Sequence, residues 1–187
     1  MSRTDIGREP WQEEYAFGAF YIFPPEDLAA KVDALRRIHD PVSAEICQAH
    51  ISLTEPLRLA LDEQQVGEIR NRLSTLKSFT IGYGPIRGNP PHPGIALAIQ
   101  PAEAVRSLRD AIHSTSAFKG VTFKRADIPP HMTIAEFITL ERSAELLHEL
   151  AEVIPSGSFE CAEVVLATPD DDFRFHEVVR FRIGRAM

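Results

Sequence analysis

The chain has 187 residues, of which 44% are hydrophobic, and its 20 basic and 27 acidic side chains give a net charge of −7. This composition is typical of a folded domain with a substantial interior and excludes an extensively disordered chain. The acidic balance argues against a protein that coats a nucleic-acid backbone, which needs a basic face, but it allows a small local phosphate pocket.

The N-terminal segment 1–14 is polar and lacks the pattern of a signal peptide, so we expect an arm that Trp11 pins to the body. No apolar run approaches the roughly 18–20 residues of a membrane span. The two cysteines, Cys47 and Cys161, form no metal-type cluster. We therefore expect a reduced, cytoplasmic, monomeric protein without a membrane contact, a metal or a cofactor.

The first half predicts the order strand, helix, strand, helix, strand. Aromatic and apolar residues predict a strand at 15–23, and prolines and acids open a helix at Pro24 that ends at Asp40. The predicted apolar stripe of this helix is Leu28, Val32, Leu35 and Ile38. The strand that holds His50 follows, then a helix capped by Asp62 and a third strand.

The second half predicts the same order. A strand at 94–99 precedes a helix opened by Pro101, and the strand that holds His131 precedes a helix at 141–154. A closing hairpin turns at 169–172. The segment between the halves, 84–94, carries four prolines and is expected to be an exposed connection.

The shared order and spacing predict an internal duplication, with halves at about 15–88 and 94–187 of one bilobal domain, 15–187. The predicted fold class is α+β: two pseudo-twofold-related lobes of antiparallel sheet flanked by helices, with the active cleft between them. Such symmetry would place the two histidine strands side by side.

Each half carries one copy of a short motif, His-x-(Ser/Thr)-apolar. The copies are His50-Ile51-Ser52-Leu53 and His131-Met132-Thr133-Ile134. On a strand, residues i and i+2 share a face, so each histidine would lie beside its hydroxyl. A third match, His113-Ser114-Thr115, lacks the alternating apolar flank and is interpreted as chance.

Paired motifs of this kind suit phosphodiester chemistry. Histidine, with an unperturbed pKa of about 6.5, can serve as the base for the attacking oxygen or the acid for the leaving oxygen. Neighbouring hydroxyls can donate to the non-bridging phosphate oxygens. The pattern does not say which histidine is the acid and which is the base.

The two motifs, on strands of repeated halves, resemble those of the 2H phosphoesterase superfamily, which includes 2′-5′ RNA ligase-like proteins and cyclic phosphodiesterases. The resemblance spans about Tyr15 to Gly184. It implies that His50 and His131 are the catalytic pair and that Ser52 and Thr133 bind the phosphate. Family members cleave 2′,3′-cyclic phosphates or related diesters, and some join or cleave 2′-5′ RNA linkages.

One departure bears on the substrate. Many RNA ligase-like members carry an arginine directly after the alanine of the second motif, where this chain has Glu136. An acid there would weaken polyanion binding. The expected substrate is therefore a small nucleotide-like or cyclic phosphate, with short RNA ends as a second class. A nucleotide-binding module without catalysis and an RNA 2′-5′ ligase stay open as alternatives.

Several basic and aromatic residues have no assigned place. Lys124 and Arg125 precede the second motif, and a solvated loop is favoured over the pocket wall. The same question applies to the strand residues Arg174, Arg180 and Arg182, for which solvent is favoured. Core or loop packing is preferred over base stacking for Tyr83 and Phe123. Cys47 is expected on the strand face opposite His50, which argues against a Cys–His nucleophile.

Overall fold

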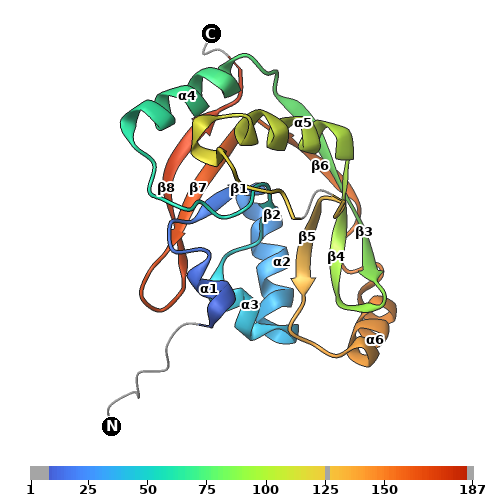
Figure 1. The fold of residues 1–187 in the computed structure, drawn as a ribbon. Helices are drawn as coiled ribbons and strands as arrows, with labels where there is room; N and C mark the ends of the chain where they lie inside the picture. The colour runs from blue at the N-terminus through green and yellow to red at the C-terminus, as the bar shows by residue number, and fades with distance from the viewer. Residues whose placement is uncertain (1–8, 125–126, 185–187) are drawn as a thin grey trace.

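A computed structural model describes residues 9–124 and 127–184, which form one curled antiparallel sheet, a half-barrel, with helices packed on it (Figure 1). The strands are β1 (Ala19–Ile22), β2 (Ile51–Ser52), β3 (Phe79–Asn89), β4 (His92–Gln100), β5 (His131–Ala135), β6 (Gly157–Cys161), β7 (Glu163–Pro169) and β8 (Phe175–Arg182). The helices are α1 (Pro10–Glu13), α2 (Glu26–His39), α3 (Pro41–Ile46), α4 (Glu63–Ser74), α5 (Ala102–His113) and α6 (Leu140–Leu150), with a 3₁₀ turn at Ser116–Phe118. The predicted α+β class with antiparallel sheet is confirmed.

The two motif strands lie next to each other at the centre of the sheet, whose order is β6-β3-β4-β5-β2-β1-β7-β8. Ile51 of β2 pairs with Met132 of β5, and Ile22 of β1 pairs with Ile51 on the other side. This adjacency confirms the expected neighbourhood of the histidine strands. The strand β2 has only two residues, so His50 directly precedes it.

β4 and β1 flank the two motif strands in equivalent places, but β3 and β6, which end the two predicted halves, lie on the same side of the sheet. β3 pairs with both β4 and β6, although β3 precedes and β6 follows the helices of the second half. β7 pairs with β1 and with β8. One side of the sheet is therefore built from the middle of the chain, β3 to β6, and the other side combines β1 and β2 from the N-terminal part with β7 and β8 from the C-terminal part.

A single large core lies on one face of the sheet and beneath the helices. Phe20 and Ile22 of β1 join it, as do Leu28 and Val32 of α2. The predicted stripe of α2 is wrong at its end, because Ile38 is 71% exposed. The buried face of the helix continues from Leu28 and Val32 to Arg36. Among the described residues, no helix combines the length and hydropathy that a membrane crossing requires.

The proline-rich segment 84–94 is mostly exposed, as expected, but it is a β-hairpin and not an irregular connection. β3 continues to Asn89 and β4 begins at His92, with Ile86 paired to Leu97. The register shifts between Tyr83 and Ile86, around Pro85. An irregularity of this kind accommodates a residue that has no N–H to donate to the ladder. The helix predicted at 141–154 also ends earlier, at Leu150.

Candidate active site

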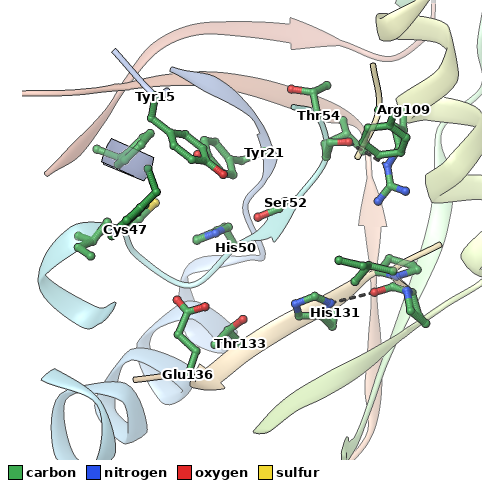
Figure 2. Close-up of a pocket in the computed structure, with 18 of the residues that line it drawn as sticks. Tyr15, Tyr21, Cys47, His50, Ser52, Thr54, Arg109, His131, Thr133 and Glu136 are labelled. Carbon is green, nitrogen blue, oxygen red and sulfur yellow. Dashed lines mark hydrogen bonds between the residues drawn. The ribbon is translucent and has the colours of Figure 1, made fainter. Parts of the chain in front are cut away.

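The two motifs project their polar side chains from one face of the sheet. Ile51 and Met132 are fully buried in the core, and side chains alternate faces along a strand. The opposite face carries the four predicted site residues, His50, Ser52, His131 and Thr133 (Figure 2). All four line one cavity of about 570 Å³. The structure thus brings the predicted residues together.

The two histidines share one hydrogen-bonding arrangement. Nδ1 of His50 lies 2.7 Å from the carbonyl oxygen of Gln48, and Nδ1 of His131 lies 2.8 Å from that of Pro129. A carbonyl oxygen only accepts, so Nδ1 carries the hydrogen in both rings. In the neutral ring Nε2 then carries no hydrogen and can take up a proton. The protonated ring can release that proton again from Nε2.

His50 lies deeper than His131. Its ring contacts Tyr21 edge-on at 4.8 Å and Phe23 at 6.4 Å between centroids, whereas His131 is exposed. The pKa of His50 is lowered to about 4, mainly by burial; the hydrogen bond to Gln48 opposes this shift, and the charges of Arg36 and His131 add to it. His50 is therefore neutral at pH 7.

One end of the cavity is aromatic. It is lined by Trp11, Tyr15, Tyr21, Phe137, Phe173 and Phe175. Trp11 meets Phe173 edge-on at 5.2 Å, and Phe173 meets Phe175 in the same way at 5.4 Å. The ring of Trp11 therefore contacts the body as the sequence predicted, and it does so as part of the cavity wall.

The β7–β8 turn holds Phe173 in an unusual conformation. Its φ is +61°, and its side chain is buried against the aromatic rings. The side chain of Asp170 accepts hydrogen bonds from the backbone N–H groups of Asp172 and Arg174. The strained φ is thus held by a hydrogen-bonded turn next to the cavity, a pattern that occurs at functional sites.

The other end of the cavity carries Arg109, a residue of α5 that belongs to none of the sequence motifs. Arg109 is only 5% exposed, its Nε donates to the carbonyl oxygen of Leu53 at 3.0 Å, and its guanidinium lies 4.6 Å over the ring of Phe123. Phe123 itself lines the cavity, together with Thr54. In the sequence Arg109 is an ordinary charged residue next to the apolar Leu108 of α5. Only its burial, which the sequence does not show, distinguishes it.

The chance match at His113 has a structural place beside this end. Its ring stacks on Phe118 at 4.4 Å, and its Nε2 accepts a hydrogen bond from the backbone N–H of Glu55. Burial lowers the pKa of His113. It is not among the residues that line the cavity.

Glu136 lines the cavity directly after the second motif. Figure 2 shows its side chain beside Thr133, on the His50 side. Its backbone N–H and that of Phe137 donate to Oδ2 of Asp40, at 2.7 and 3.0 Å, and Asp40 is buried. The end of α2 thereby fixes the segment that follows β5. An acid does lie in this pocket, as the departure from the arginine pattern predicted.

The expectation for Cys47 is corrected. Cys47 lies at the end of α3, before the strand begins, and it lines the same cavity as His50. The chain from Cys47 to His50 bends at Ala49 and is not a regular strand, so the two side chains do not alternate faces as they would on one. Burial raises the pKa of its thiol to about 12, so the thiol stays protonated at pH 7.

The described basic residues that the sequence left without a place, one loop lysine and three strand arginines, do not line the cavity of the motifs. Lys124 is exposed and pairs with Glu14 at 3.6 Å, while Arg125 lies outside the described residues. The strand arginines, Arg174, Arg180 and Arg182, are all exposed, and none lines the cavity of the motifs. Across residues 9–124 and 127–184, no group of three metal-ligating side chains is assembled.

Solved structures share this fold. One described as a phosphoesterase is 17% identical, with a TM-score of 0.59 over 89% of this chain and 98% of that chain. E. coli LigT in complex with 3′-AMP is also 17% identical (TM-score 0.59; 89% and 97%), and LigT with NADP⁺ is 16% identical (TM-score 0.56; 89% and 96%). No curated protein sequence matches the chain significantly.

The sequence itself matches a family model. The model of the 2′-5′ RNA ligase superfamily covers residues 24–173, a span that includes both histidine motifs and the strands that bring them together. The chain therefore belongs to the 2′-5′ RNA ligase superfamily.

Proposed function

We propose that the protein is a metal-independent phosphoesterase that hydrolyses a cyclic phosphate or a small 2′-5′ or 2′,3′-type diester. His50 and His131 act as the base and acid, and Ser52 and Thr133 bind the phosphate. The observation that carries the proposal is the matched pair of imidazoles, each with Nδ1 on a carbonyl oxygen, in one cavity.

The lowered pKa of His50 supports the role of base for this residue and the role of acid for His131. Since its pKa is lowered to about 4, His50 enters the reaction neutral and takes a proton from the attacking water at Nε2. Water oxygen bonds to phosphorus and the bond from phosphorus to one ribose oxygen breaks. His131, which enters this step with a proton on Nε2 as well as on Nδ1, gives its Nε2 proton to that ribose oxygen. The hydroxyls of Ser52 and Thr133 donate to the non-bridging oxygens as charge develops. Exchange with solvent restores both rings.

The cavity favours a small ligand over a long polymer. Its volume of about 570 Å³ is in the range of small-molecule sites, and its aromatic end offers faces on which a base can stack. The carboxylate of Glu136 disfavours an extended polyanion. Structures of E. coli LigT with 3′-AMP, NADP⁺ and ATP support ligands of the nucleotide class.

The test is turnover of a diester panel by EDTA-treated protein, with 2′,3′-cyclic nucleotides and 2′-5′-linked dinucleotides as substrates. His50→Ala and His131→Ala should each lower kcat by about 10²–10⁴-fold. His148→Ala, on the exposed side of α6, should keep the wild-type rate. A wild-type protein that cleaves none of the panel, or histidine variants with full activity, would refute the proposal.

Two results would select another function. Tight nucleotide binding without turnover would indicate a binding module, and joining of RNA ends would indicate a ligase. We also propose that the protein acts in the cytoplasm as a monomer. Sedimentation equilibrium tests the oligomeric state directly.

A further inference from the structure

Arg109 is a buried cation whose hydrogen-bonding capacity is not used up. Among the described residues, its guanidinium donates a hydrogen bond only from Nε, to Leu53, and Nη1 is buried with no partner there. One face of the group is covered by Phe123. The planar fork of an arginine is suited to bind phosphate through its terminal nitrogens.

A purely structural role does not account for this arrangement. The carbonyl of Leu53 needs one donor, which a neutral side chain could supply, while burying a charge with unpaired N–H groups is unfavourable. The charges of Asp110 and Glu55 favour the cation, yet burial still lowers the pKa of Arg109 overall. Arg109 lines the cavity, so an anion bound at this end would supply it with an acceptor and a counter-charge.

The position of Arg109 relative to the histidines indicates which group of the substrate that anion would be. Figure 2 shows Arg109 at the end of the cavity away from Tyr15 and Cys47, with Ser52 and His131 between the two ends in this view. The aromatic residues, the histidine pair and Arg109 thus line successive parts of one cavity.

A ribose presents its groups in the same order. The base is attached to C1′, a 2′,3′-phosphate bridges the next two carbons, and the 5′ group is attached through C4′ on the far side. A base on the aromatic end and a reacting phosphate between the histidines would direct the 5′ group towards Arg109.

We propose that Arg109 forms a second phosphate subsite, so that the preferred substrate is a nucleotide that carries a 5′-phosphate in addition to the reacting phosphate on its 2′,3′ edge. The placement of the reacting phosphate rests on the proposed function, and the subsite is tested by binding, which needs no turnover.

Calorimetry with two probes tests the subsite. Adenosine 3′,5′-bisphosphate should bind the wild-type protein about tenfold more tightly than adenosine 3′-monophosphate, as a charge-assisted contact of this kind predicts. Arg109→Met should bring the two affinities to within about twofold by weakening only the bisphosphate. Arg109→Lys keeps the charge without the fork and should retain part of the preference.

Arg72→Met is the matched control, since it removes the same charge from the exposed side of α4 and should leave the preference unchanged. Equal affinity of wild-type protein for the two probes overturns the proposal, even if no Arg109 variant folds. An unchanged preference in folded Arg109→Met also overturns it. If inorganic phosphate abolishes the preference without displacing the monophosphate, the subsite takes a free anion, and the substrate assignment is wrong.

The outcomes separate the subsite from the proposed hydrolysis. A preference that depends on Arg109 without any turnover would leave the subsite standing and refute the esterase. If turnover depends on both histidines while kcat/KM is equal for 2′,3′-cyclic AMP with and without a 5′-phosphate, the esterase stands and the subsite is refuted.

Discussion

Oδ2 of Asp40 accepts a hydrogen bond of 2.7 Å from the backbone N–H of Glu136, 96 residues away in the chain. The same oxygen accepts from Phe137, and Oδ1 accepts from the backbone N–H of Ser43 at the start of α3. One buried carboxylate therefore connects the first half of the chain to the residue that follows the second motif.

Asp40→Ala should lower the free energy of unfolding by about 2–3 kcal/mol, because three backbone N–H groups lose a charged acceptor. It should also reduce kcat/KM, since the segment after Thr133 loses its anchor. Urea unfolding and steady-state kinetics measure the two effects. Asp62→Ala, which removes the exposed cap of α4, should cost about 1 kcal/mol and leave the kinetics unchanged. Equal kinetic effects of the two variants would contradict the anchoring role.

The hydroxyls of the motifs can be tested separately from the histidines. Ser52→Ala and Thr133→Ala should each lower kcat by about 10²-fold, as expected when one donor to a developing oxyanion is lost. Thr80→Ala removes a hydroxyl from an exposed position of β3 and is the control. An effect confined to KM would show that the hydroxyls bind ground state and transition state equally.

The depressed pKa of His50 predicts how stability depends on pH. His50 has a pKa of about 4 in the folded protein and about 6.5 in the unfolded chain, so between these values the unfolded chain binds more protons. The free energy of unfolding should fall by about 1–3 kcal/mol as the pH drops from 6.5 to 4, and the contribution of His50 should be fully present above pH 6.5.

Urea unfolding of His50→Asn at several pH values measures that contribution. The variant should have a shallower pH dependence than the wild type, whereas His148→Asn, at an exposed position, should follow the wild type. Parallel wild-type and His50→Asn profiles would contradict the burial of His50.

Two glycines with opposite surroundings provide a stability test of the fold. Gly18 has a φ of +79°, and a Cβ there would overlap the carbonyl oxygen of Ala167. Gly18→Ala should therefore lower the free energy of unfolding by about 3 kcal/mol or more. Gly67 lies inside α4 with open space around it, so Gly67→Ala should raise stability by about 0.5–1 kcal/mol. Thermal unfolding compares both, and a tolerated Gly18→Ala would contradict the packing of β1 against β7.

The parts of the site that were predictable are those encoded in local patterns. Strand alternation places His50 with Ser52 and His131 with Thr133, and the repeated order of elements puts the two motifs on neighbouring strands. The side-chain cap of Asp62 is also a local signal, and the structure confirms it. The motif pairs and the cap depend on residues within a few positions of one another, and the repeated order of elements needs only the succession of such local signals along the chain.

What could not be predicted depends on contacts between distant segments. Arg109 becomes a cavity residue only because Leu53 and Phe123 pack against it. The sequence predicts Asp40 only as the end of a helix. Its second role, as acceptor of the backbone N–H of Glu136, depends on a contact between residues 96 positions apart. Cys47 enters the cavity because α3 interrupts the extended chain that the pattern implied.

The strand order has a consequence for the integrity of the molecule. β3 belongs to the N-terminal part of the chain, yet its partners β4 and β6 both lie in the C-terminal part, and β1 is paired on one side to β7. A break in the β3–β4 turn would yield two fragments, each holding one histidine motif and each missing sheet partners supplied by the other. Each histidine motif therefore lies in a sheet that is complete only when both fragments contribute their strands.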